Sequence, residues 1–528
     1  LSQNTEYVVQ IRSLCASGQS QWRQVIFTTS VLDLPRLYVK AGGTGNGSSW
    51  AKAMGDLNDA LSTAEAIKSA TNTIPDIWVA QGIYYGDSVS ANAFTIREGI
   101  NVYGGFAGDE PDNYDLSQRD FTAHPSILDG QHSQRVLFQE SNFATSTEWN
   151  GFTIQNGNAS GNGGGALLLD MTNLRHCVIR DNTASSNGGG IYIYNSSYTK
   201  YGTIEHCTVT HNTATSNAGG IFSRYGIMHH CIISHNQVTS SNGYGGGVYA
   251  EFTNTSVNMI SNCLVANNTA ARGGGIYSSN NCFVENTTVV CNLSTTGCAG
   301  VLGGRLHNCI AWGNQQGTAA SNVSTTANYC TYSAVEGGCP GTGNISLMPE
   351  SFDNGRYYPY FVLPALTAGH TDTTENVDWH LQNGSICVNR GGDNYVNTPD
   401  STDLDGTARV KQGTVDMGCY ESDHQGITLP NYGDILYVKV NGSGDHTGTS
   451  WDNALGSISD ALSLAQMFNA DIWIAEGIYY GDSVSESAFV MVDGVSMYGG
   501  FVGNEPADYD LTQRDLDAHV TILDGQHS

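Results

Sequence analysis

The chain has 528 residues, of which 39% are hydrophobic and only 13% are charged, and it contains 64 glycines. Charged residues at about half their usual share argue against a helical bundle or a coiled coil. The formal net charge of −28 at pH 7 disfavours nucleic acid, whose binding relies on Lys and Arg. It disfavours anionic membrane surfaces as well. The sequence has no apolar run of about 18 residues, so we expect no membrane insertion in this segment. The composition favours an acidic protein of short strands and turns.

Two alternating strand patterns open the chain, at 7–11 and 24–27, on either side of a polar turn at Gly18. A lone hairpin is marginally stable in water, so we expect these strands to belong to something larger. The run around Trp22 resembles the last two strands of a fibronectin type III domain. Residues 1–30 are therefore interpreted as the C-terminal strands of such a domain.

A long internal repeat organises the rest of the chain. Residues 76–133 align without gaps with residues 471–528, and 38 of the 58 positions are identical. The alignment predicts a first module at 36–424, a linker at 425–435 and the N-terminal part of an identical module at 436–528. We expect the parent protein to be longer and built of tandem modules.

Each module begins with an amphipathic helix pattern, at 57–67 in the first copy and at 458–465 in the second. The first coil of a solenoid has an exposed edge, so we expect this helix to cap it. Strand patterns at 77–80, 100–103 and 126–128 are predicted to form the first coils.

A unit of two short strands recurs between about 150 and 315. Its first half ends in asparagines spaced 30, 24, 32, 24 and 22 residues apart, at Asn182, Asn212, Asn236, Asn268, Asn292 and Asn314. Most copies also carry a cysteine five residues earlier, at Cys177, Cys207, Cys231, Cys263 and Cys309. Leucine-rich repeats share this period, but their leucine frame is absent. The period and the β-branched strands predict stacked β-coils.

The second half of the unit is a glycine-rich triplet followed by an apolar strand, as at 188–192. The glycines allow the backbone to turn tightly beside the neighbouring coil. Alternation along the strands turns the cysteines inward as a ladder of buried thiols, about 4.8 Å apart. The asparagines are predicted to bond to the coils above and below, and to adopt the left-handed backbone conformation.

These motifs resemble those of right-handed parallel β-helix proteins of the pectate-lyase-like superfamily. The glycine and asparagine pattern is similar to repeats of polymorphic outer-membrane proteins and bacterial adhesins. Residues 403–409 and 415–421 resemble the closing segment of β-helix surface proteins called "choice-of-anchor Q". The predicted fold class is all-β: a right-handed parallel β-helix solenoid with an N-terminal capping helix, followed by the start of a second module. The resemblance implies a fold rather than an activity.

Enzymes of this fold gather carboxylates on one face of the coils, whereas the acidic residues here are scattered. Hydrolysis needs two carboxyl groups about 5–10 Å apart. Asp181 and Glu205, on adjacent coils, are the candidate catalytic pair. They occupy different positions in the repeat, so solvated surface charge is the alternative interpretation.

Two sets of residues are candidate metal ligands. Asp400, Asp403 and Asp405 resemble a short Ca²⁺ loop, with a closing turn that is salt-bridged through Arg409 as the alternative. We expect no cofactor, with calcium at this loop as the one exception. Histidines also repeat in two columns, one of His176, His206 and His230 and the other of His211 and His235. Such columns suit Zn²⁺ or Cu²⁺. Asparagines take over the first column in later coils, which favours a plain polar ladder instead.

Thirteen cysteines leave the disulfide connectivity open. Cys330 and Cys339, in an irregular stretch, are the best candidates for a disulfide.

The leading hypothesis is a non-catalytic module of a secreted cell-surface protein, a rigid display or adhesion rod. Its expected partners are surface glycans, other cell-surface proteins and neighbouring modules of the same chain. Tyrosines such as Tyr192, Tyr249 and Tyr277 are either exposed to sugars or packed against loops. The competing hypothesis is a polysaccharide-active lyase, hydrolase or epimerase, so enzymatic activity is left open.

Overall fold

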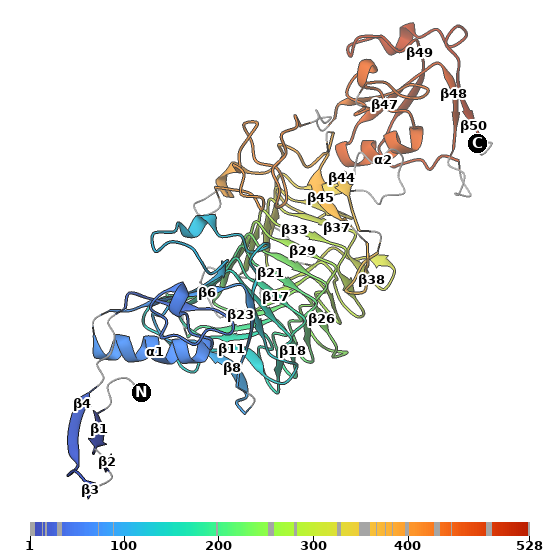
Figure 1. The fold of residues 1–528 in the computed structure, drawn as a ribbon. Coiled ribbons are helices and arrows are strands. Elements are labelled where there is room, and N and C mark those ends of the chain that lie inside the picture. The colour runs from blue at the N-terminus through green and yellow to red at the C-terminus, as the bar shows by residue number, and fades with distance from the viewer. Residues whose placement is uncertain are drawn as a thin grey trace. The chain divides into compact units, whose positions relative to one another are not determined.

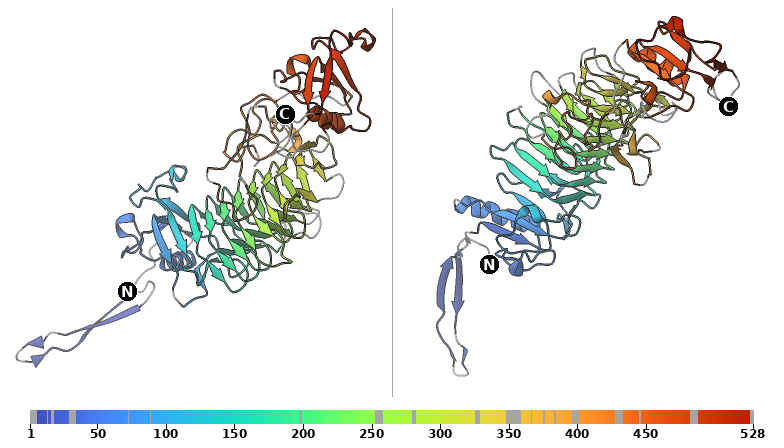
Figure 2. Two further views of the ribbon diagram at one scale, coloured as in Figure 1. Left: turned by 90° about the vertical axis from the view of Figure 1, so that its right-hand side faces the viewer. Right: turned by 90° about the horizontal axis from the view of Figure 1, so that it is seen from above.

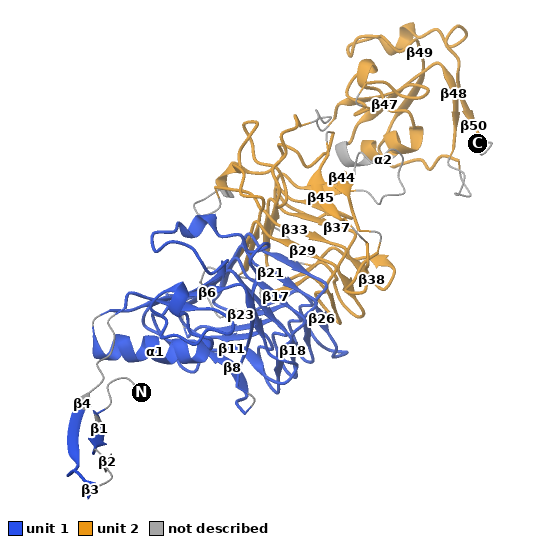
Figure 3. Cartoon of the chain, viewed as in Figure 1, with its two compact units in different colours: residues 1–258 blue, residues 259–528 orange. Residues whose placement is uncertain are grey.

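The structure is a computed structural model of the chain. It describes residues 6–12, 14–15, 18–28, 34–71, 73–87, 89–196, 199–251, 258–278, 282–324, 329–347, 359–365, 367–374, 376–382, 384–395, 401–426, 433–444, 446–481 and 488–525. The described residues form an all-β parallel solenoid with few helices, which confirms the predicted fold class. Two compact units, Leu1–Asn258 and Met259–Ser528, are described in turn (Figure 3).

A narrow antiparallel ribbon opens unit 1. β1 (Glu6–Ile11) pairs with β4 (Arg23–Thr28), and β2 (Leu14–Cys15) pairs with β3 (Gly18–Gln19). The two predicted strands are confirmed. The resemblance to a fibronectin type III domain stays a prediction.

The helix α1 (Leu57–Ala70) packs against the first strands of unit 1 (Figure 1). Asp56 caps it by accepting hydrogen bonds from the amides of Asn58 (2.6 Å) and Asp59 (3.2 Å). Its apolar face is buried through Leu57, Ala60, Leu61, Ala64 and Ile67. The predicted helix is confirmed, and it continues to Ala70. Thr71 is its C-cap residue, and the Thr71 hydroxyl donates a hydrogen bond to the carbonyl of Ile67.

Each coil of unit 1 contributes up to four short strands, and equivalent strands of successive coils pair in parallel, as Figure 2 shows. Sheet 1 contains β5 (Arg36–Val39), β6 (Asp76–Ala80), β9 (Val102–Phe106), β12 (Thr147–Asn150), β16 (Thr172–Arg175), β20 (Thr203–Glu205) and β24 (Ile227–His229). Sheet 2 contains β7 (Gly82–Tyr85), β10 (Ser126–Asp129), β13 (Phe152–Gln155), β17 (Val178–Arg180), β21 (Thr208–Thr210) and β25 (Ile232–Ser234). Sheet 3 contains β14 (Asn158–Ala159), β18 (Thr183–Ala184), β22 (Thr213–Ala214) and β26 (Gln237–Val238). Sheet 4 contains β8 (Asn92–Thr95), β11 (Arg135–Phe138), β15 (Ala166–Leu168), β19 (Ile191–Tyr194), β23 (Ile221–Arg224) and β27 (Val248–Glu251).

One predicted strand is displaced. The strand expected at 100–103 is β9, which begins at Val102. A turn occupies the preceding residues, because Gly99 has a φ of +74° and the amide of Ile100 bonds to the carbonyl of Arg97.

The cysteines of the repeat line the inside of the coils. Cys177, Cys207 and Cys231 are at most 1% exposed, which confirms the predicted ladder of buried thiols. Each thiol also ties two coils together. The Sγ of Cys207, for example, lies 3.5 Å from the carbonyl oxygen of Leu174 in the preceding coil and 3.3 Å from that of Glu205 in its own.

Within each unit the asparagines form a ladder of buried amides. Asn212 Oδ1 accepts from the main-chain N–H (3.1 Å) and from Nδ2 (2.9 Å) of Asn182. Its own Nδ2 lies within 3.0 Å of Asn236 Oδ1 and of the carbonyl oxygens of Ile179 and Thr210. The predicted bonding between coils is confirmed.

The left-handed conformation was assigned to the wrong residue. The asparagines turn their side chains inward, and the residue just before each of them is left-handed instead, as at Asp181 (φ 57°) and His211 (φ 55°). The residue before each ladder cysteine is left-handed as well, for example His176 (φ 50°) and His206 (φ 51°). Asp, Asn and His are the non-glycine residues that best tolerate this geometry, and it makes both corners of sheet 2 sharp.

The last glycine of each triplet lies directly against the asparagine ladder. A Cβ on Gly190 would lie 2.9 Å from the carbonyl oxygen of Gly220 and 3.0 Å from Asn212 Nδ2. Real Cβ contacts are rarely this short, so the site excludes a side chain. The glycine and asparagine motifs therefore recur together because they touch.

Unit 2 is built from coils with the same strand order. Strands of the sheet 1 type are β28 (Asn258–Ser261, whose first residue closes unit 1), β32 (Cys282–Glu285), β36 (Arg305–His307) and β41 (Cys330–Thr331). Those of the sheet 2 type are β29 (Leu264–Ala266), β33 (Thr288–Val290), β37 (Ile310–Trp312), β42 (Ala334–Glu336) and β43 (Ile345–Leu347). Sheet 3 positions hold β30 (Thr269–Ala270), β34 (Leu293–Ser294) and β38 (Gln315–Gln316), with β39 (Ala319–Ala320) antiparallel to β38. Sheet 4 positions hold β31 (Ile276–Ser278), β35 (Val301–Leu302) and β40 (Val323–Ser324). Cys330 and Cys339 are joined by the predicted disulfide.

The described parts of 359–424, here called the return segment, pack on the outer face of the unit 2 coils. The segment contains an antiparallel pair, β44 (Phe361–Leu363) and β45 (Asp378–Leu381), and a short helix, η4 (Asp393–Tyr395). Its backbone N–H groups bond to the coils: that of Gly369 to the carbonyl of Cys291 (2.8 Å) and that of Cys419 to the Thr288 hydroxyl (3.1 Å).

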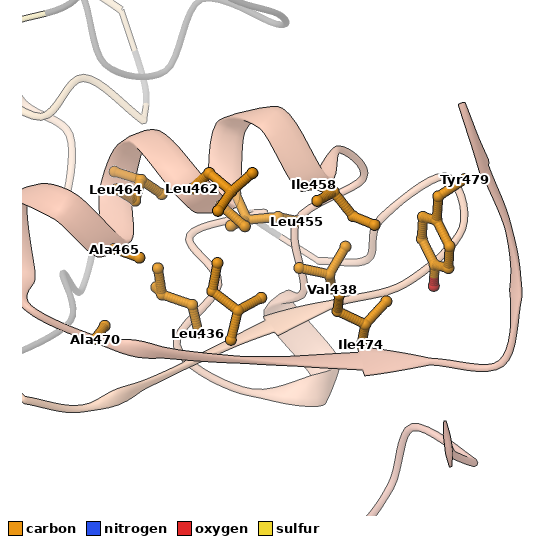
Figure 4. Close-up of a cluster of buried hydrophobic side chains, with 12 residues drawn as sticks. Leu436, Val438, Leu455, Ile458, Leu462, Leu464, Ala465, Ala470, Ile474 and Tyr479 are labelled. Atoms are coloured by element: carbon orange, nitrogen blue, oxygen red, sulfur yellow. The ribbon is translucent and has the colours of Figure 1, made fainter. Parts of the chain in front are cut away.

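Beyond residue 433, unit 2 repeats the start of the first module. Its elements are β46 (Ile435–Val438), η5 (Trp451–Asn453), α2 (Ile458–Phe468), β47 (Asp471–Ala475), β48 (Gly477–Tyr480), β49 (Met497–Phe501), η6 (Leu511–Gln513) and β50 (Thr521–Asp524). Figure 4 shows Ile458 and Leu462 of α2 packed over Leu436 and Val438 of β46. The copy reproduces the capping arrangement of α1; the last residues of its alignment, 526–528, lie outside the described residues.

Candidate functional surfaces

The predicted catalytic residues lie on different sheets of unit 1. Asp181 follows β17 of sheet 2, and its Oδ2 is 3.9 Å from Arg180 Nε. Glu205 ends β20 of sheet 1, and its Oε2 is 3.0 Å from Arg175 Nη2. The guanidinium of Arg175 also lies near Glu148. The structure pairs each carboxylate with its own arginine. Partly exposed pairs of this kind contribute about 0–1 kcal/mol to stability.

The predicted calcium ligands are held by several partners. Asp400 lies outside the described residues. Asp403 is 1% exposed, and its two oxygens accept the amides of Thr407 (2.7 Å) and Glu421 (2.9 Å). Among the residues that the structure describes, no group of three or more His, Cys, Asp or Glu is placed to hold a metal ion.

Asp405 takes part in a cluster that sequence reasoning missed. Its Oδ2 lies 2.7 Å from His380 Nε2, and Asp378 Oδ1 lies 2.6 Å from His380 Nδ1. Burial lowers the pKa of His380, but the hydrogen bonds to Asp405 and Asp378 outweigh burial and raise it overall. The Asp-X-His pattern at 378–380 was the available signal, although nothing in the sequence placed it beside Asp405.

Arg409 lies beside a different acid from the one expected. It is 1% exposed, its Nη2 donates to the carbonyl of Asp416 (3.1 Å), and its Nη1 lies 3.8 Å from Glu421 Oε2. Burial, followed by the charge of Asp416, raises the pKa of Glu421 to about 8. Arg409 Nη2 also lies 3.4 Å from Asn286 Oδ1 on the coils, so the cluster anchors the return segment.

The histidine columns are stacks of parallel rings. The centroids of His176 and His206 are 5.0 Å apart with planes 7° apart, and those of His211 and His235 are 5.1 Å apart with planes 5° apart. Rings stacked in this way keep their nitrogens in separate parallel planes. Burial, followed by the neighbouring His230, lowers the pKa of His206 to about 4, so the ring is neutral at pH 7. The arrangement is that of a ladder of stacked rings.

A row of aromatic side chains lies on the outer face of sheet 4 in unit 1. Tyr192, Phe222 and Tyr249 pair across neighbouring strands, with ring centroids 4.7 Å and 5.0 Å apart. Phe222, between the two tyrosines, is only 7% exposed. The ring faces are thus turned toward one another, and the partly exposed tyrosines show mainly their edges. The sequence revealed the tyrosines but not the stacking.

Comparison with family models found the Chlamydia polymorphic membrane protein repeat at residues 176–194. This stretch holds two left-handed corner residues, His176 and Asp181, together with one ladder asparagine and one glycine triplet. Comparisons with curated proteins and with solved structures found no match. None of the described helices is long and apolar enough to cross a membrane. The repeat match and the parallel β-solenoid together fit the repeat region of a surface protein.

Proposed function

We propose that the chain is a non-catalytic module of a large secreted cell-surface protein, a stiff rod that displays neighbouring modules and adheres to surface glycans or to other surface proteins. The observation that carries the proposal is the ladder construction of the coils. Buried amides, buried thiols and stacked imidazoles repeat from coil to coil, and much of their bonding and stacking is with the equivalent side chains of the next coil. These side chains therefore hold successive coils of the solenoid together.

Two further observations support a place outside the cell. The Cys330–Cys339 disulfide suits an oxidising compartment. The repeat at 176–194 belongs to a family named for membrane proteins. Low charged content and many Asn, Ser and Thr residues suit a rod that stays soluble through uncharged polar groups.

A product assay tests the non-catalytic part of the proposal. The purified chain is incubated with neutral and acidic polysaccharides, with and without Ca²⁺, and unsaturated and reducing-end products are followed. We expect no product above that of heat-denatured protein. Product that disappears in an Asp181→Asn, Glu205→Gln variant would replace the rod by an enzyme. Product that persists in this variant would also contradict the proposal and would place the active site elsewhere.

A further inference from the structure

We propose that the outer aromatic row of sheet 4 in unit 1 is the adhesive surface, and that its partner is a neutral, extended polysaccharide. The row consists of one outward position on successive strands, occupied by Phe138, Leu167, Tyr192, Phe222 and Tyr249. This inference rests on the proposed function and names the surface that would perform it.

The spacing of the row calls for an extended partner with a short repeat. Each coil adds one side chain, at the strand separation of about 4.8 Å. The rings follow this spacing: the centroids of Tyr192 and Phe222 are 4.7 Å apart, and those of Phe222 and Tyr249 are 5.0 Å apart. A compact ligand would contact only one or two side chains of such a row, whereas a chain of sugar rings laid along it would contact all of them.

The chemistry of the exposed edges suits sugars better than a purely apolar partner. Stacking turns the ring faces toward one another, and Tyr192 and Tyr249, which carry phenol groups, stay partly exposed. Binding sites for small molecules combine apolar contact area with a few polar groups that fix orientation. Sugar rings present apolar C–H groups and hydroxyls in alternation, which matches both kinds of group.

The charge of the row favours a neutral polymer. None of its five side chains is ionic, and burial, followed by the nearby Tyr194 and Glu251, raises the pKa of Tyr192, which keeps its phenol uncharged. Arg224, in the adjacent outward row, lies over the Tyr194 ring (4.6 Å) and pairs in register with Glu251. The chain as a whole carries −28, so a polyanion meets long-range repulsion.

The test is affinity electrophoresis of the whole chain in gels that contain a neutral β-glucan, a neutral α-glucan or polygalacturonate. We expect retardation by at least one neutral polymer and none by polygalacturonate. A Tyr192→Ser, Tyr249→Ser variant should bind at least tenfold more weakly. Tyr201→Ser is the matched control, because Tyr201 is 44% exposed and lies outside the row, and it should bind like the parent chain. Unfolding curves of each variant establish that it is folded, and Tyr192→Phe, which keeps the stack, replaces the double variant if that variant does not fold; it should bind more weakly than the parent.

Three outcomes would overturn the inference. They are retardation by polygalacturonate alone, no retardation by any neutral polymer, and retardation that the row variants leave unchanged. Light scattering adds a fourth: a dimer of the parent chain that the row variants abolish would make the row a contact between two copies. If the binding test fails and the product assay finds no product, the proposal of a non-catalytic rod still holds. Product in the earlier assay would contradict the non-catalytic rod itself.

Discussion

Asn212 shows why one residue type recurs at the same corner of the coils. Its side chain completes the hydrogen bonding of Asn182 in the coil before and reaches Asn236 in the coil after. A buried polar group that loses its partner costs far more than an average hydrogen bond contributes. Each asparagine is therefore required by both of its neighbours.

Replacing Asn212 by alanine should lower the free energy of unfolding by about 3 kcal/mol, because the buried N–H and Nδ2 of Asn182 lose their acceptor. Chemical denaturation measures the change. Asn158→Ala is the control: this asparagine is exposed and bonds to the carbonyl of His132, so its loss should cost less than about 0.5 kcal/mol. Equal effects of the two substitutions would show that the ladder does not stabilise the stack.

Gly190→Ala tests the contact between the glycine triplet and the ladder. The added Cβ would press on the carbonyl of Gly220 and on Asn212 Nδ2, and overpacking of this kind costs about 1–3 kcal/mol. Gly161 is the matched glycine, because a Cβ there meets nothing within 4 Å, and its alanine variant should be as stable as the parent chain. Thermal unfolding of both variants decides between a specific contact and a general intolerance of alanine.

The histidine stack should make unit 1 sensitive to acid. The pKa of His206 is lowered to about 4 in the folded chain from an ordinary value of about 6.5. The unfolded chain then binds the proton more readily, so the stability that this group contributes is present above pH 6.5 and is lost as the pH falls toward 4. His206→Asn should flatten the fall of the unfolding midpoint between these pH values. Asparagine suits the site because Asn262 holds the same left-handed position (φ 48°). An unchanged pH profile would contradict the prediction.

At the scale of elements, the return segment explains a change in the outward residues of the coils. Where it covers unit 2, strand β37 turns Ile310 (1% exposed) and Trp312 (5% exposed) outward beneath it. The corresponding outward residues of β21 in unit 1 are Thr208 and Thr210. The outer face is thus apolar where the return segment covers it.

Trp312→Ala should loosen the return segment before it loosens the coils. Trp312 packs edge to face with Phe361 of β44, at a centroid distance of 6.0 Å, and removal of a buried tryptophan side chain costs about 3–5 kcal/mol. Limited proteolysis followed by mass spectrometry should show earlier cleavage within 359–424. Ser234→Ala, at an outward position of unit 1, should leave the cleavage pattern as it is. Cleavage that begins within the coils would contradict this assignment.

The elements with a strict sequence period were predictable, and the return segment was not. Cys177, Asn182 and Gly190 recur at fixed places because each meets its own equivalent in the next coil, and a period in the sequence records that contact directly. The return segment meets the coils through long-range contacts, such as Cys419 with Thr288, and no period marks them. The left-handed corner was misplaced by one residue, because the tolerance of asparagine for that geometry pointed to the ladder position rather than to the residue before it.

At the scale of the whole molecule, ionic groups were the least predictable part of the candidate sites. Asp181 and Glu205 are neighbours in the repeat count, yet the coil carries them to different sheets. Asp403 and Asp405 are two residues apart, yet one is buried against backbone amides and the other meets His380. Sequence spacing fixes neither the burial nor the partner of a side chain in an irregular segment. The aromatic row was easier to anticipate, since its tyrosines share one repeat position.

The measurement that tests the ladder account most directly is amide hydrogen exchange across the whole chain. If the ladders make the coils one cooperative stack, the amides of Asn182, Asn212 and Asn292, which donate to the next asparagine, should exchange together and orders of magnitude more slowly than those of the exposed loop at 109–113. Ladder amides that exchange as fast as that loop, or coil by coil at unrelated rates, would contradict the stiff rod.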